Sequence, residues 1–298
     1  MKSKIFLVVL SVVLLSAWLV NAQKSRSAKT IFAVLNDGKT LEPIAFIENG
    51  KLKEIGGNIV KAENKPDFVK THYKPKTKYN LIFGGDDVGT VTVIKDLADS
   101  ECTSNQAQIS VQSSQVSPKG FVMALATDAE AKRAVKGVRR LPTPAERSVI
   151  EQTVMAELQS ENVPIKNINA LRYHNLTKLD VDNNGDYEFV GTYWYNSGDK
   201  KRSLLFIIAE KDAKGRISLP YKKFQEIKEE NVLSSDISDL GKGFYHELLI
   251  DIFDYDGDGV SEIFTITPAF EGSNFNVYKR KDGKWTKAFE NSNYHCAY

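Results

Sequence analysis

The sequence DYDGDGVSE, residues 254–262, alternates acidic side chains with small residues and ends on a glutamate. Oxygens at its first, third and fifth positions, a glycine at the sixth and a carboxylate at the ninth can converge on one hard cation such as Ca²⁺. A near-copy, DVDNNGDYE, occupies residues 180–188. Two such loops in one chain predict a repeated β unit that a metal ion holds together.

The residues around the two loops repeat as well. An apolar run enters each loop, an apolar and aromatic run leaves it, and a third run follows before a glycine turn. These runs are 176–179, 189–195 and 204–209 in the first copy, and 248–253, 263–267 and 275–278 in the second. Because the loop spacing and the flanking runs recur together, we expect an internal repeat of strand, loop, strand and strand.

The loops are not EF-hands, which need a glutamate at position twelve and a helix on each side. Position twelve is Gly191 in one loop and Thr265 in the other, and the flanks are strand-like. The nine-residue form resembles the calcium loops of FG-GAP or VCBS repeats, the β-propeller blades of integrin α subunits and many secreted bacterial proteins. This resemblance implies Ca²⁺ ligands from the side chains of Asp254, Asp256, Asp258 and Glu262 with the carbonyl of Val260, and from Asp180, Asp182, Asn184 and Glu188 with the carbonyl of Asp186.

The chain departs from that family in two respects. The Phe-Gly and Gly-Ala-Pro signatures are missing, and two blades cannot close a propeller, which takes four to eight. Either the N-terminal strands supply further blades of one small β-propeller, or the two units pack as a sandwich-like pair. The acids could also serve only as Asx turns, but four carboxylates within nine residues would then repel one another without a cation.

The N-terminal half is predicted to be a small β-sandwich or barrel. Seven short β-type runs alternate with turn residues such as the Asn49-Gly50 pair. The runs are 31–35, 44–47, 51–55, 79–83, 90–94, 107–112 and 121–126. Lysines cluster at 61–78 among aromatic residues, which we interpret as a solvated loop face.

A helix is expected to begin at Thr143-Pro144-Ala145-Glu146, where threonine and glutamate form a capping box and proline takes the first helical position. Its apolar side, expected to pack on a sheet, consists of Ala145, Val149, Ile150, Val154 and Leu158. The predicted organisation is a signal peptide at 1–22, an N-terminal β domain at 23–126, a linker and helix at 127–164, and a C-terminal domain with both repeats at 165–298.

The N-terminus has the pattern of a secretory signal, with two lysines, an apolar run at 5–20 and small residues before Gln23. Cleavage after Ala22 would leave a secreted or periplasmic protein with no membrane span; the alternative is an uncleaved anchor. Loss of the two lysines takes the formal charge from +2 to 0, which gives no electrostatic basis for nucleic-acid binding. Cys102 and Cys296 are the two cysteines, and export favours a disulfide between them over two thiols.

Catalytic motifs are not found in the sequence. His246-Glu247 begins like a zinc-protease helix but has isoleucine in place of the second histidine. His174 and His246 precede the loops by six and eight residues, so on extended strands they would share a face with the first aspartate of each loop. We interpret them as packing or surface residues. Tyr193, Trp194, Tyr195 and Trp285 are candidates for a glycan or peptide groove, or for the core.

The sequence thus predicts a mostly β, exported, calcium-binding repeat protein. Its expected role is that of a binding, adhesion or structural module, with an unidentified protein or glycan ligand at the cell surface. The alternative is a calcium-dependent hydrolase of the cell envelope whose catalytic carboxylates the sequence cannot pair.

Overall fold

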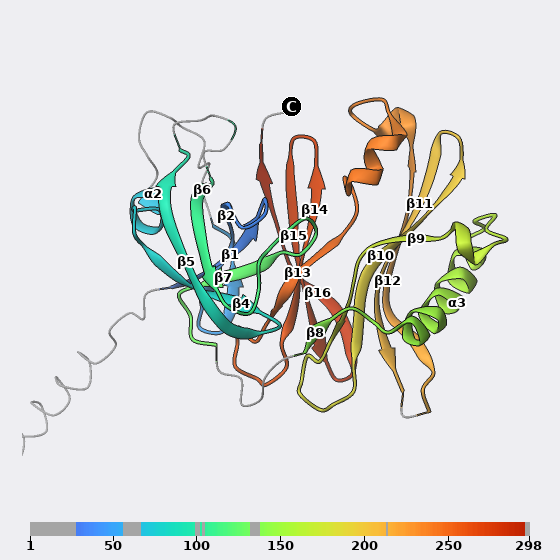
Figure 1. Cartoon of the computed structure of the whole chain (residues 1–298), viewed down its shortest axis with the longest axis horizontal. Helices are drawn as coiled ribbons and strands as arrows, with labels where there is room; N and C mark the ends of the chain where they lie inside the picture. The colour runs from blue at the N-terminus through green and yellow to red at the C-terminus, as the bar shows by residue number, and fades with distance from the viewer. Residues whose placement is uncertain are drawn as a thin grey trace, which may run out of the picture.

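The computed structural model describes residues 28–55, 67–98, 102, 105–131, 138–212 and 214–295. The predicted signal peptide and Cys296 lie outside these residues. The protein is mostly β, and its parts stand side by side: a barrel, a four-stranded sheet, a five-stranded sheet and a helix on the far face of the latter (Figure 1).

The N-terminal strands close into a six-stranded antiparallel barrel in the order β1-β7-β4-β5-β6-β2, and β2 pairs back to β1. A short β3 extends β2 beyond the barrel. All seven predicted strands are present: β1 Lys29–Leu35, β2 Thr40–Glu48, β3 Lys51–Lys53, β4 Lys78–Phe83, β5 Asp86–Asp96, β6 Ala107–Ser113 and β7 Ala124–Thr127. Closure leaves none of these six strands free to form a further propeller blade.

The barrel interior is filled by alternate side chains of its strands and by a helix that the sequence did not predict. This helix, α2 (Asp67–His72), contributes the buried Val69. Tyr73, expected on a solvated loop, is buried in the same cluster, and Phe68 packs against it. The interpretation of 61–78 as a solvated face is therefore wrong for its aromatic residues, which supply apolar area to a small core.

The C-terminal half forms two antiparallel sheets of the same design. In each, four consecutive strands form a meander, with the aspartate loop between the first strand and the second. The first sheet contains β9 Arg172–Leu179, β10 Glu188–Gly198, β11 Lys201–Lys211 and β12 Ile217–Lys228, with the two-residue β8 (Arg139–Arg140) at its edge; the second contains β13 Leu248–Phe253, β14 Glu262–Ala269, β15 Gly272–Lys281 and β16 Lys284–Tyr294. The predicted repeat is present, with a fourth strand in each copy that the sequence did not indicate.

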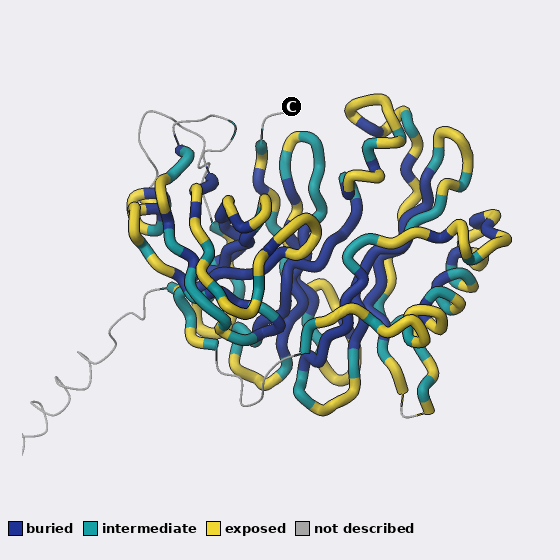
Figure 2. The backbone as a smooth tube through the Cα atoms, viewed as in Figure 1, coloured by how far each residue is buried: buried dark blue, intermediate teal, exposed yellow. Residues whose placement is uncertain are grey.

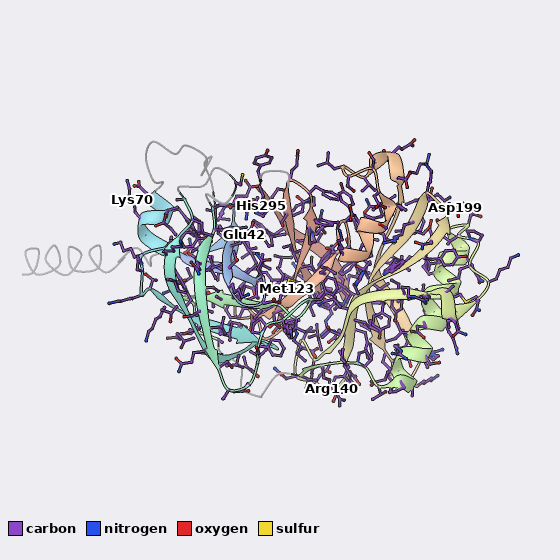
Figure 3. The ribbon with its side chains drawn as sticks, turned by 45° about the horizontal axis from the view of Figure 1, so that its top comes forward. Glu42, Lys70, Met123, Arg140, Asp199 and His295 are labelled. Atoms are coloured by element: carbon purple, nitrogen blue, oxygen red, sulfur yellow. The ribbon has the colours of Figure 1, made fainter. Side chains whose placement is uncertain are left out.

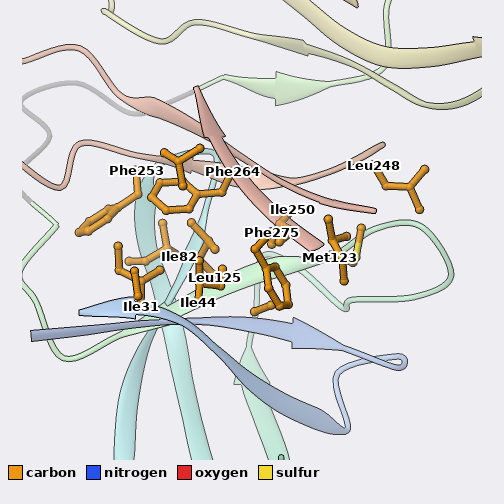
Figure 4. Close-up of a cluster of buried hydrophobic side chains, with 14 residues drawn as sticks. Ile31, Ile44, Ile82, Met123, Leu125, Leu248, Ile250, Phe253, Phe264 and Phe275 are labelled. Atoms are coloured by element: carbon orange, nitrogen blue, oxygen red, sulfur yellow. The ribbon is translucent and has the colours of Figure 1, made fainter. Parts of the chain in front are cut away.

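The two sheets pack face to face, so they form the sandwich-like pair. Leu179, Val190 and Ile208 of the first contact Ile252 and Ile263 of the second in one buried cluster. The other face of the second sheet packs on the barrel (Figure 4). Because the second sheet is covered on both sides, β13 is buried at every position (Figure 2), which explains why all its residues except Asp251 are apolar.

Helix α3 (Pro144–Ser160) covers the outer face of the first sheet and begins with the predicted capping box between Thr143 and Glu146. Its buried stripe is Ile150, Val154 and Leu158. Ala145 and Val149 were expected on this side but are exposed. They precede the stripe by one residue in each turn, which rotates them about 100° away from the sheet.

The C-terminal strand is tied to the barrel through Glu42, which is fully buried. Asn293 Nδ2 donates to Glu42 Oε1 at 2.9 Å, and His295 Nε2 lies 2.9 Å from the same oxygen (Figure 3). Gln106 Nε2 donates to Glu42 Oε2 at 3.1 Å. The residue next to Cys296 thus lies against the segment that follows Cys102.

An ion pair joins β8, at the edge of the first sheet, to β13 of the second sheet, and a barrel turn contacts both partners. Asp251 of β13 is fully buried, and its Oδ2 lies 2.9 Å from Arg139 Nη1. The N–H of Gly84, in the β4–β5 turn, donates to Asp251 Oδ1 at 2.9 Å. The Arg139 guanidinium also stacks on the Phe83 ring at 4.2 Å. Burial raises the pKa of Asp251 to about 6 against the lowering effect of Arg139.

We expect Arg139→Met to lower the free energy of unfolding by about 3–5 kcal/mol, because it leaves a buried carboxylate unpaired. A carboxyl group whose folded-state pKa is raised costs stability as the pH rises above its ordinary value. The loss should therefore be larger at pH 8 than at pH 5, as measured by urea denaturation. Arg140→Met, on the exposed neighbour, is the control and should change stability by less than about 0.5 kcal/mol; equal losses in both variants would contradict the role given to Asp251.

Candidate metal centre

The loop at 254–262 is closed by the side chain of its first residue. The N–H of Gly257 donates to Asp254 Oδ1 at 2.7 Å, and that of Gly259 donates to Oδ2 at 3.0 Å. Both glycines have positive φ, 78° and 89°, a conformation that costs glycine little and other residues more. The glycines of the sequence pattern are therefore needed for the fold of the loop.

The other three acids each use one oxygen for the loop and keep one for a cation. Asp256 Oδ1 and Asp258 Oδ1 accept from the N–H groups of the residues two positions on, at 3.4 and 2.9 Å; the second of these donors is Val260. Glu262 Oε2 accepts from the Tyr255 N–H at 3.4 Å. The Asx turns considered as an alternative to metal binding are present, and they leave one oxygen of each acid unused by the loop backbone.

The remaining oxygens surround the ammonium group of Lys279, from β15. Lys279 Nζ lies 2.5 Å from Asp256 Oδ2, 2.8 Å from Asp258 Oδ2 and 2.8 Å from Glu262 Oε1. Of the described acids, histidines and cysteines, Asp254, Asp256 and Glu262 have ligand atoms within 4.8 Å of one another. The Lys279 ammonium group therefore lies at the position expected for a metal ion.

Glu262 is the buried member of this group, with 1% of its surface exposed. Burial raises its pKa to about 8, although Lys279 acts in the opposite direction. A buried carboxylate is costly unless it is paired, so the loop needs a cation at this point, whether it is an ammonium group or a metal ion.

The loop at 180–188 repeats these contacts. Glu188 Oε2 accepts from the Val181 N–H at 3.1 Å, the same link between positions nine and two. The N–H of Gly185 donates to Asp180 Oδ2 at 3.3 Å, and that of Asp186 to Asn184 Oδ1 at 2.6 Å. The two loops thus share their backbone design as well as their sequence.

Arg280, rather than a lysine, provides the cation at this second loop. It binds Asp182, and its Nη1 lies 3.1 Å from Glu188 Oε1 and 3.5 Å from Glu210 Oε1. Neighbouring residues of a strand point to opposite faces, so Lys279 and Arg280 of β15 serve the loop of their own sheet and that of the facing sheet. Sequence reasoning missed Lys279, Arg280 and Glu210.

A comparison of the two repeats could have indicated Glu210 and Lys279. Glu210 pairs with Glu188 across β10 and β11. In the second repeat Ile263 pairs with Tyr278, which puts Lys279 beside Glu262. Glu210 of the first repeat thus occupies the position that Lys279 occupies in the second repeat.

The aromatic residues considered for a glycan or peptide groove divide between core and surface. Tyr193 and Trp285 are buried, and Trp285 Nε1 donates to Glu210 Oε1 at 2.7 Å. Trp194 and Tyr195 are partly buried. A groove formed by all four is therefore excluded.

Comparisons with known proteins identified no relative: no family model, no curated protein and no solved structure matches the chain. No helix within the part of the chain that the structure describes has the length and apolar character needed to cross a membrane.

Lys279→Met should lower the free energy of unfolding in the presence of chelator by on the order of 2 kcal/mol, because three carboxylates lose a charged hydrogen-bond donor. If a metal ion competes with the ammonium group, the same variant should bind calcium about tenfold more tightly, which calorimetric titration measures. Lys281→Met, at an exposed position of the same strand, is the matched control. A variant whose calcium affinity is unchanged or lower would show that Lys279 does not occupy the metal position.

Proposed function

We propose that the protein is an exported calcium-binding β-repeat module of the FG-GAP or VCBS type, with a binding, adhesion or structural role. The observation that carries this proposal is the convergence of Asp254, Asp256 and Glu262, with their ligand atoms within 4.8 Å of one another. Carboxylates in this number and spacing are the ligands that Ca²⁺ prefers. Lys279 would hold the loop when calcium is absent and move aside when it binds.

The loop at 254–262 should be the tighter of the two sites. Its side chains present four carboxylates, whereas the loop at 180–188 has neutral Asn184 at the fifth position. Arg280 is also held more firmly than Lys279, since it lies 5.7 Å from the Trp285 ring centroid and is shared with Glu210. A flexible lysine is displaced at a lower cost than a planar, stacked guanidinium group.

The position of the loops suggests what calcium would do. Both lie between the first two strands of a sheet, and their cations come from one strand that packs between the two loops. An ion at either site would fix the loop that joins the first two strands of that sheet's meander. This favours a structural function of the metal over a catalytic one.

The surface cavities support the hydrolase alternative less than the loops support calcium binding. A cavity of about 10 Å³ beside Glu247 has room for a single water molecule. A larger, open hollow is lined by Lys200, Lys228, Glu229, Glu230 and Ser235. Its two glutamates face lysines, with Lys200 Nζ 2.9 Å from Glu229 Oε1, so they are charge-paired surface residues.

The calcium proposal is tested by titration calorimetry and by thermal unfolding in calcium and in chelator. Calcium that binds only the folded state adds about 2.7 kcal/mol of stability at a hundredfold excess over its Kd. Asp256→Asn should remove more of this gain than Asp182→Asn, because the site at 254–262 has the higher ligand charge. A melting temperature that is the same in chelator and in calcium would exclude the proposal.

Export and a Cys102–Cys296 disulfide belong to the same proposal. The contact of His295 with Glu42, and that of Gln106 with Glu42, support the pairing because they bring the neighbours of the two cysteines together. Mature protein should begin at Gln23 and show no free thiol when it is unfolded without reductant. An N-terminal sequence that starts at Met1, or two titratable thiols, would contradict this part of the proposal.

A further inference from the structure

A second cluster of polar side chains differs from the two loops in composition, because it is cationic and aromatic rather than acidic. It consists of His174 on β9, Trp194 on β10, Arg202 on β11 and His246, just before β13. The two histidine rings are 4.7 Å apart between centroids, and the Arg202 guanidinium lies 4.1 Å from the centroid of the Trp194 ring. Phe121, from the barrel, packs on His174 at 4.7 Å.

The strand register explains why these side chains meet. His174 is paired with Thr192, and Arg202 with Asn196. Thr192, Trp194 and Asn196 alternate along β10, so their side chains share one face of the sheet. The two histidines were expected to share a strand face with the first aspartate of each loop, and this expectation is wrong. The positive φ of Asn175, 56°, interrupts the extended backbone after His174, and His246 lies outside β13.

Five buried nitrogen atoms of this cluster lack hydrogen-bond partners within the described part of the chain. They are His174 Nε2, both ring nitrogens of His246, Trp194 Nε1 and Arg202 Nη1. His246 is fully buried, and Arg202 is 4% exposed. Each unpartnered buried polar group costs about 1–3 kcal/mol, so a group of them in one cluster indicates a missing ligand.

Arg202 is also a buried cation without an acidic partner among the described residues. Its one polar side-chain contact there is with the neutral Asn196, whose Oδ1 accepts from Nε at 3.1 Å. The nearest acid in sequence to the cluster, Glu247, is committed elsewhere: its Oε1 accepts from Thr265, Asn276 and Tyr278, and its Oε2 lies 3.3 Å from Lys223. A buried charge of this kind requires a counter-ion.

We infer that this cluster is a binding site for a small inorganic anion, held by Arg202, Trp194 and the two histidines. All the donors needed are present: a guanidinium group, an indole N–H and imidazole N–H groups. Burial, His174 and Arg202 lower the pKa of His246 to about 3, and burial and Arg202 lower that of His174. Both rings are therefore neutral at neutral pH and act as N–H donors rather than as cations.

The size of the anion follows from the packing. His246 is fully buried and Arg202 is 4% exposed, and Phe121 packs on His174 from the barrel side, so only a small ion would fit among these side chains. A transition metal is disfavoured because the guanidinium of Arg202 adds positive charge beside the imidazole rings.

Bromide titration tests the inference, because bromide quenches tryptophan fluorescence and Trp194 belongs to the site. At constant ionic strength, with gluconate as the balancing anion, quenching should contain a saturable part that chloride competes away. Arg202→Met should weaken this part by about tenfold or more, since it removes a charged hydrogen-bond donor. Arg172→Met, on an exposed neighbour in β9, should leave it unchanged.

His246→Phe provides a second variant, and thermal unfolding provides a second measurement. Chloride should raise the melting temperature of the native protein and of Arg172→Met, but not that of Arg202→Met or His246→Phe. Quenching that is linear in bromide for every variant, with no chloride-dependent stabilisation, would overturn the inference. Stabilisation by Zn²⁺ that depends on His246, in the absence of any halide effect, would overturn it in favour of a metal site.

Discussion

The arrangement of the C-terminal half depends on two adjacent cations in one strand. Lys279 and Arg280 point to opposite faces of β15, and each enters a loop rich in carboxylates. The loops close through backbone N–H groups, which occupy one oxygen of Asp256, Asp258 and Glu262 each. The other oxygens would repel one another without positive charge between them. The loops are therefore built around a cation position, and β15 links the two positions across the sheet pair.

The rest of the molecule keeps this strand in place. The second sheet is packed between the first sheet and the barrel, with apolar clusters on both sides. Asp251 connects it to the first sheet through Arg139 and to the barrel through the Gly84 N–H, while Glu42 holds the end of β16. A strand fixed at both faces positions its side chains with little freedom, and this precision is what a metal site requires. The barrel thus serves as a support for the repeat pair as well as an independent core.

Turn chemistry and capping made much of the fold predictable from the sequence. Turn residues mark the seven N-terminal strands, Thr143 and Glu146 mark the start of α3, and the acid spacing marks both loops. The fourth strand of each sheet was missed because β12 and β16 are mostly polar and exposed, so neither contains the continuous apolar run that marks the strands beside the loops. Lys279, Arg280 and the Arg202 cluster could not be foreseen, since their roles depend on which sheets face each other and on strand register.

The most direct test of this account is a crystal structure of the protein at saturating calcium, with lanthanide substitution for an anomalous signal. The account predicts an ion bound by Asp254, Asp256, Asp258 and Glu262, with the Lys279 ammonium group moved out of the loop. Density that shows Lys279 still bound to these carboxylates, with no ion at 254–262, would contradict it. In that case the lysine would be the permanent occupant of the loop, and the repeats would be held together without a metal.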